Sequence, residues 1–201
     1  MRGSVGVGHS LGAVTTLLAA AEDPGLFKAV VAIDPVILSG WTSILWGTMK
    51  TVGVGDHLPL VRGARKRRQL FPDRDAARAA YRHRRMFRAW DEDCLDDYLE
   101  TALAPAADGG LTLRFPRSWE ARIFRLSPHN VWPQLRRLRV PSLFIQGEHS
   151  DSFSSAAARK VLRQVPGARL SIFDGNGHCV PMECPVSVGE AVLDFLDDAA
   201  T

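Results

Sequence analysis

The residue best suited to covalent chemistry in this chain is a serine near the amino terminus, within Gly8-His9-Ser10-Leu11-Gly12. Small and β-branched residues lead into this stretch from residue 4, and an Ala- and Leu-rich segment without a helix breaker follows it to residue 21. A serine at a sharp turn from strand to helix has its hydroxyl pushed away from the backbone, where a base can reach it. The two glycines predict that strand and helix approach too closely for side chains at either position.

Two segments near the carboxyl terminus contain residues that could activate this serine. They are Gly147-Glu148-His149-Ser150-Asp151 and Gly175-Asn176-Gly177-His178, and each directly follows a segment that we expect to be a strand. Ligand chemistry gathers in such loops at the carboxyl ends of strands in open α/β sheets. His178 would take the Ser10 proton during attack on an acyl carbon, and Asp151 would orient the imidazole and stabilise it once charged.

A second candidate for the acid is Asp34, which directly follows the apolar run 29–33. Its position at the end of a strand also suits a carboxylate that supports a histidine. The loop context favours Asp151, and Asp34 remains the alternative.

The elements that must position these residues alternate between strand and helix at both ends of the chain. Continuous apolar runs are typical of parallel strands covered on both faces. Helices are indicated by Ser capping, by Pro at helix starts and by apolar residues at helical spacing. The expected strands are 4–8, 29–33, 141–147 and 168–173, and the expected helices are 11–21, 155–165 and one from 185. This order predicts an α/β fold with an open, mostly parallel sheet of about four strands.

Residues 36–139 interrupt that alternation. Helical spacing of apolar residues predicts one helix within 72–90 and another over 95–103, and no strand pattern is evident. Residues 38–60 carry no assignable pattern. We therefore expect a sheet domain of residues 1–35 and 140–201 and a helical insertion of residues 36–139.

The serine motif, the order Ser10, Asp151, His178 and the strand before each of them together resemble the α/β-hydrolase superfamily. The resemblance covers almost the whole chain and includes Gly177-His178 followed by Glu183-x-Pro185. It implies a serine hydrolase with a helical cap, acting on a small ester or related acyl compound without a cofactor. The backbone N–H of Leu11 would donate to the oxyanion of the tetrahedral intermediate.

The resemblance also implies that the chain corresponds to the carboxyl-terminal portion of the fold, beginning at the serine turn. The second oxyanion donor of the family has no counterpart here, and losing one such donor typically costs about 10²–10³ in rate. The strand before Ser10 would be an exposed edge without lysine, proline or charge, which favours a homodimer or larger assembly through that edge. The alternative function is therefore a catalytically silent remnant that acts as an interaction or dimerisation module.

Composition restricts the partners. The formal net charge of +3 and the single basic run Arg65-Lys66-Arg67-Arg68 argue against a nucleic-acid-binding protein. No apolar stretch approaches the ~20 residues of a membrane span. Three widely spread cysteines suit free thiols in the cytoplasm, and their spacing around His178 matches no zinc pattern. No dinucleotide fingerprint is present, so the expected partner is a small acyl substrate, with neither a metal nor a cofactor.

Overall fold

The computed structural model describes residues 3–51, 55–107, 109–128 and 130–200. These divide into two compact units, one formed by residues 1–43 and 129–201 and the other by residues 44–128. The first unit contains the parallel sheet and the second contains helices with a small antiparallel sheet. Each unit is described separately below.

The sheet of the first unit has four parallel strands, as the sequence predicts, and their lateral order is β1-β2-β6-β7. Its two inner strands are buried, because helices cover both of their faces. β1 and β7 form the edges, where the side chains of Val7 and Ile172 are each 52% exposed. The strands are β1 (Ser4–His9), β2 (Phe27–Ile33), β6 (Ser142–Gly147) and β7 (Ala168–Phe173).

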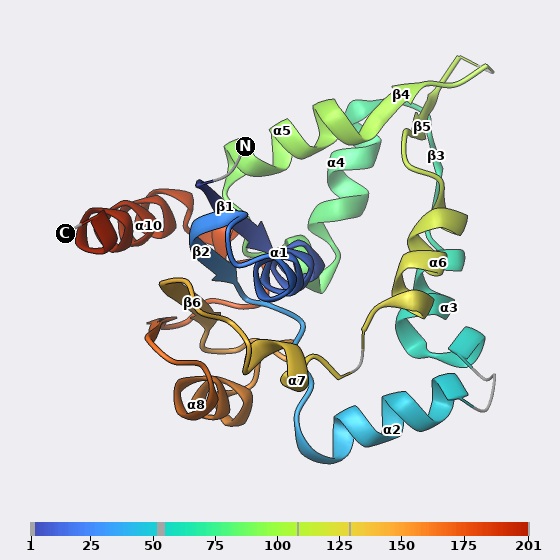
Figure 1. Cartoon of the computed structure of the whole chain (residues 1–201). Helices are drawn as coiled ribbons and strands as arrows, with labels where there is room; N and C mark the ends of the chain where they lie inside the picture. The colour runs from blue at the N-terminus through green and yellow to red at the C-terminus, as the bar shows by residue number, and fades with distance from the viewer. Residues whose placement is uncertain (1–2, 52–54, 108, 129, 201) are drawn as a thin grey trace. The chain divides into compact units, whose positions relative to one another are not determined.

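Alternation along the inner strands sends side chains to two apolar layers. Val30, Ala32 and Phe144 pack with α1, α7 and α8 on one face. Val31 and Ile145 pack with α9 and α10 on the other. Figure 1 shows α1 and α10 on opposite sides of the sheet. These helices are α1 (Leu11–Glu22), α7 (Trp132–Leu135), α8 (Ser155–Gln164), α9 (Val180–Glu183) and α10 (Pro185–Ala200).

The segment that leads into β6 already belongs to the sheet unit. This unit therefore resumes before residue 140, the expected boundary. Trp132, Leu135 and Leu138 are buried in the layer against α1 and α8. The Trp132 indole N–H also donates to the Leu38 carbonyl at 2.8 Å. The boundaries of the units therefore lie at 43/44 and 128/129, eight to eleven residues inside the expected insertion.

The second unit is mainly helical. Residues 38–60 carry no sequence signal and begin in the first unit; their described parts, 38–51 and 55–60, are largely helical too. Within the helical stretch expected over 72–90, Ala77 and Tyr81 are buried. The elements that fall wholly or mostly in this unit are α2 (Gly40–Thr51), η1 (Gly55–His57), α3 (Pro59–Arg65), α4 (Arg74–Arg82), η2 (Arg85–Phe87), α5 (Glu92–Ala102) and α6 (Arg117–Leu126).

A three-stranded antiparallel sheet in the second unit was not expected from the sequence. It has the order β3-β5-β4, formed by β3 (Leu70–Phe71), β4 (Leu103–Pro105) and β5 (Leu111–Leu113). The hairpin between β4 and β5 turns through Gly109, which has a φ of +89°. Strands of two or three residues are too short to show an alternating pattern, so the expectation of no strands in residues 36–139 is wrong.

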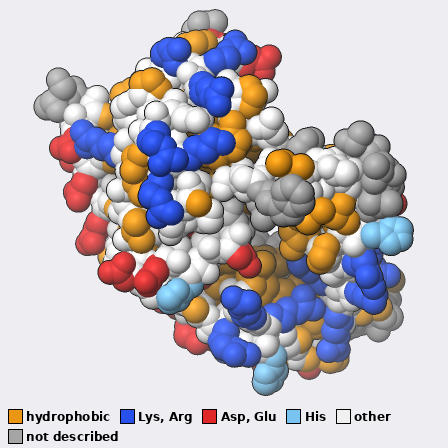
Figure 2. Space-filling view, turned by 90° about the horizontal axis from the view of Figure 1, so that it is seen from below, with side chains coloured by type: hydrophobic (Ala, Val, Ile, Leu, Met, Phe, Trp, Pro, Cys, Tyr) orange, Lys and Arg blue, Asp and Glu red, His pale blue; other side chains and the backbone are white. Residues whose placement is uncertain are grey.

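The basic run of the second unit is engaged by its neighbours. Arg65 pairs with Asp56 at 2.8 Å, and Arg67 pairs with Glu120 at 2.8 Å. The Arg68 guanidinium lies 4.9 Å from the centre of the Phe71 ring. On the face shown in Figure 2, Lys and Arg side chains lie in separate groups among hydrophobic and acidic ones. None of the helices in the described ranges is long and apolar enough to cross a membrane.

Candidate active site

The site lies at the carboxyl end of the parallel sheet, where β1 turns into α1. Ser10 occupies this turn with a φ of 57° and a ψ of −120°, a backbone conformation that non-glycine residues rarely adopt. Its N–H donates to the Ile33 carbonyl of the neighbouring strand at 2.9 Å, and its own carbonyl accepts from the Val14 N–H. Bonds on both sides therefore hold the strained residue, as the sequence predicts for a strand-to-helix turn.

Only one of the two flanking glycines is required by close approach. A Cβ at Gly8 would lie 2.5 Å from the Gly12 carbonyl oxygen, whereas a Cβ at Gly12 would have no atom within 4 Å. The expectation that both positions exclude side chains is therefore wrong for Gly12. The space beside Gly8 is occupied by the backbone of Gly12, so it is Gly8 that cannot carry a side chain.

We expect Gly8→Ala to lower the free energy of unfolding by about 3 kcal/mol, because backbone atoms cannot move away from the new methyl group as a side chain could. Gly12→Ala is the matched control, since alanine in a helix is favoured over glycine by about 0.5–1 kcal/mol. Urea denaturation of both variants measures the difference. Equal stabilities for the two variants would contradict the packing described for this turn.

His178 meets the serine from the loop after β7. The Ser10 hydroxyl donates to His178 Nε2 at 2.9 Å, and the imidazole is mostly buried. The opposite ring nitrogen, Nδ1, donates to Asp34 Oδ2 at 2.6 Å. A hydroxyl, an imidazole and a carboxylate in this order can deprotonate the serine and then stabilise the resulting imidazolium.

The carboxylate of this chain of bonds comes from Asp34 and not from Asp151. Asp34 is fully buried, and it also accepts the Gly147 N–H at 3.0 Å and the Ser150 hydroxyl at 2.5 Å. Asp151 is exposed, and its carboxylate accepts from the Ser152 hydroxyl at 3.4 Å. The expectation that Asp151 holds His178 is thus corrected in favour of the alternative, Asp34.

The sheet order gives the physical reason for this correction. β2 is the direct neighbour of β1, and Ile33 is paired with His9, so the residue after β2 emerges beside the serine turn. Asp151 follows β6, one strand further away and four residues beyond its end. Ser150 points its hydroxyl at Asp34 and also accepts the Ser152 and Phe153 N–H groups, which fixes the loop with Asp151 toward solvent.

The loop that carries His178 is fixed by two glutamates. Glu148 accepts the Gly175 N–H at 2.8 Å, and Glu183 accepts the Gly177 N–H at 2.6 Å. The end of β6 also touches this loop, because a Cβ at Gly147 would lie only 2.1 Å from the Gly177 carbonyl oxygen. In the sequence, Glu183 was visible only as part of a motif, and no signal pointed to a role for Glu148.

His9 is a further residue of the site that sequence reasoning did not single out. Its Nε2 lies 2.8 Å from the His178 carbonyl oxygen, and the two imidazole rings are 5.0 Å apart. Burial is the main cause that lowers the pKa of His9 from its ordinary value. The only sequence signal was its place beside Ser10 in the motif.

The Leu11 N–H is the candidate oxyanion donor. It opens α1, directly after Ser10. Among the residues that the structure describes, no acceptor is found for this N–H. It is therefore available to a developing negative charge at the positive end of the helix.

No metal-binding cluster of His, Cys, Asp or Glu occurs in the described ranges. Cys94 and Cys184 are free thiols. Burial raises the pKa of the Cys184 thiol, so the group beside the histidine loop is a poor thiolate ligand.

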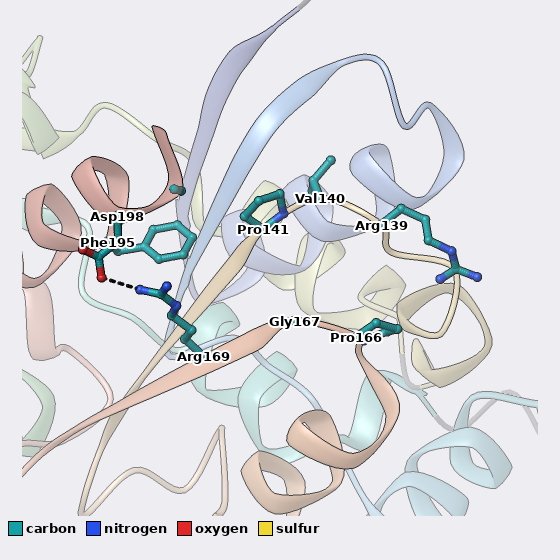
Figure 3. Close-up of a pocket in the computed structure, with 9 residues that line it drawn as sticks. Arg139, Val140, Pro141, Pro166, Gly167, Arg169, Phe195 and Asp198 are labelled. Carbon is teal, nitrogen blue, oxygen red and sulfur yellow. Dashed lines mark hydrogen bonds and ion pairs between the residues drawn. The ribbon is translucent and has the colours of Figure 1, made fainter. Parts of the chain in front are cut away.

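A pocket of about 420 Å³ lies away from these residues, at the amino ends of β6 and β7 (Figure 3). Arg139 and Pro141 line one side, and Arg169 pairs there with Asp198 at 2.7 Å. The strands run from this pocket toward Ser10 and His178, so the pocket lies at the other end of the sheet from the serine.

Comparisons with known proteins agree with this fold. Residues 2–191 match the model of the "Alpha/beta hydrolase family". The chain is 31% identical over 193 residues to the 2-(acetamidomethylene)succinate hydrolase of Mesorhizobium japonicum, covering 95% of this chain and 63% of that protein. It thus spans somewhat less than two thirds of that relative's length.

Solved structures give the same result. A crystal structure of E-2-(acetamidomethylene)succinate hydrolase superposes with a TM-score of 0.77 at 27% identity, covering 98% of this chain and 67% of that one. An esterase of M. tuberculosis superposes with a TM-score of 0.70 at 20% identity, covering 96% and 62% of the two chains. The family match over nearly the whole chain, together with the parallel sheet and its serine turn, shows that this chain belongs to the alpha/beta hydrolase family.

Proposed function

We propose that this chain is a serine hydrolase that acts on a small ester or related acyl substrate through Ser10, His178 and Asp34. The observation that carries the proposal is the continuous run of hydrogen bonds from the Ser10 hydroxyl through both His178 nitrogens to the buried Asp34 carboxylate. The similarity to a 2-(acetamidomethylene)succinate hydrolase supports a hydrolase activity for this chain.

In the proposed reaction Ser10 Oγ attacks the acyl carbon while His178 Nε2 takes its proton. The negative charge on the substrate oxygen is met by the Leu11 N–H, at the start of α1. His178 then gives the proton to the leaving oxygen, and an acyl group remains on Ser10. Water attacks this acyl-enzyme with His178 again as the base, which releases the acid and restores the serine.

Hydrolysis of p-nitrophenyl acetate, butyrate and octanoate tests this proposal. The unchanged protein is expected to release p-nitrophenol above background, with a preference among the chain lengths. Ser10→Ala is the control, because the substitution removes one oxygen and leaves the fold intact. Equal rates for the two proteins would contradict a serine hydrolase.

Self-association through β1 is a second candidate role, which does not require catalysis. Among the described strands β1 pairs only with β2, and Val7 in the middle of β1 is 52% exposed. An exposed strand without charge or proline is a template for pairing with another strand. The simplest product is a two-fold dimer joined across two copies of β1.

We expect light scattering after size-exclusion chromatography to give a dimer at tens of micromolar. Val7→Lys should shift the protein toward monomer, because a charge on an edge strand disfavours pairing. Ile172→Lys on the opposite edge strand is matched in exposure and should leave the dimer intact. A monomer without any substitution would rule out this role.

A further inference from the structure

The imidazole of His9 is bound to the main chain of the residue that carries the candidate base. His9 Nε2 lies 2.8 Å from the carbonyl oxygen of His178. A carbonyl oxygen can only accept a hydrogen bond, so Nε2 of His9 carries the proton and is the donor. The rings of the two histidines lie 5.0 Å apart with their planes tilted by 37°.

The His9 bond holds a different backbone group from the other contacts of the loop that carries His178. Glu148 and Glu183 hold the N–H groups of Gly175 and Gly177, which precede His178. His9 instead holds the peptide carbonyl of His178 itself. Because His9 is also the neighbour of Ser10 in the chain, the bond connects the backbone of the nucleophile turn to the backbone of the base.

We propose that His9 is a positioning residue, whose neutral imidazole fixes His178 at hydrogen-bonding distance from Ser10 by donating from Nε2 to the His178 carbonyl. The expected effect of His9 on the reaction rate rests on the proposed function. The placement of His178 that it describes can be measured without any reaction.

The charge of His9 matters because His178 becomes an imidazolium when it takes the serine proton. Two positively charged rings 5.0 Å apart would repel each other and raise the energy of that step. Burial is the largest cause and lowers the pKa of His9, as does the charge of the His178 ring. The hydrogen bond to the His178 carbonyl raises this pKa, as do Asp34 and Glu183, and the net direction is downward. The net lowering keeps His9 neutral at neutral pH, with the donor role of Nε2 intact.

Two substitutions separate the donor from the ring. His9→Gln places an amide N–H near the position of Nε2 and keeps the donor. His9→Phe keeps a ring of similar size against His178 and removes the donor. We expect His9→Phe to lower kcat for p-nitrophenyl esters by about 3- to 10-fold with little change in KM, as for the loss of one hydrogen bond. His9→Gln should recover most of that loss.

The pH profile gives a readout that a purely structural role would not move. In the unchanged protein, protonation of His9 at acid pH adds a charge beside His178 and should steepen the acidic fall in kcat/KM. Neither variant can gain that charge, so both should show a shallower acidic limb than the unchanged protein. Equal rates for His9→Phe and His9→Gln, or an unaltered acidic limb in both, would contradict the proposal.

NMR of the imidazole nitrogens tests the placement without activity. In ¹⁵N-labelled protein, the His9 signals are assigned by their loss in His9→Gln. We expect the Nε2–H tautomer, a titration midpoint below 6.5, and His178 signals that shift more in His9→Phe than in His9→Gln. A proton on Nδ1, or a midpoint at or above 6.5, would overturn the inference even in an active enzyme. The expected spectra in a protein that hydrolyses no ester would support the positioning role and reject the proposed function.

Discussion

Asp34→Asn is expected to lower the rate of ester hydrolysis by about 10⁴-fold, because an amide beside His178 Nδ1 favours the wrong tautomer of the imidazole. In the folded chain Asp34 accepts from His178 Nδ1 at 2.6 Å. An asparagine there can present an N–H instead, which moves the imidazole proton to Nε2. That nitrogen could then no longer accept the Ser10 proton.

Asp151→Asn is the matched control for this prediction. Asp151 follows a strand of the same sheet, but its side chain is exposed and accepts a hydrogen bond from the neighbouring Ser152 hydroxyl. We expect the rate of ester hydrolysis by the Asp151→Asn variant to stay within about twofold of the unchanged protein, as for a surface substitution away from the site. The reverse ranking of the two variants in a p-nitrophenyl ester assay would show that the acid comes from the loop after β6.

Ser10→Ala and His178→Ala are each expected to reduce kcat to background, a loss of up to about 10⁶-fold where such groups act as one unit. The double variant should be no slower than either single variant, because neither residue activates the ester without the other. Burst and steady-state release of p-nitrophenol measure the three rates. Losses that multiply in the double variant would show that the two residues act independently.

The sheet and the serine turn could be predicted from the sequence because their signals are local and strong. The apolar run 29–33 and the strand expected over 168–173 both agree with the structure within two residues. The strained turn at Ser10 was visible from the small residues around it. The loop that brings His178 to Ser10 was identified by its place after the last strand.

The acid could not be assigned as securely, because the choice depends on the lateral order of strands. Asp34 and Asp151 both follow apolar strands, and the sequence gives no register between them. The sheet order β1-β2-β6-β7 puts Asp34 beside the serine. One sequence signal favoured Asp34: it directly follows five consecutive apolar residues of a strand, so it emerges from a buried position.

In the second unit, the sequence indicated a helix but not the small antiparallel sheet. β3 pairs with β5 across about 40 residues of sequence, as in Leu70 with Thr112, and β4 and β5 form a short hairpin. Leu95 and Leu99 of α5 repeat at helical spacing and are buried as expected. Side-chain periodicity therefore identified α5. The short sheet could not be identified in this way, because it depends on pairing between strands of two or three residues.

Labelling with a fluorophosphonate tests the central claim most directly, because the reagent reacts only with a serine that a nearby base activates. Intact-mass and peptide analysis are expected to find one adduct, on Ser10, in the unchanged protein. Ser10→Ala should show none, and His178→Ala should be labelled far more slowly. Absence of an adduct on Ser10 in folded protein, or equal labelling of Ser10→Ala, would contradict the assignment of Ser10 as the nucleophile.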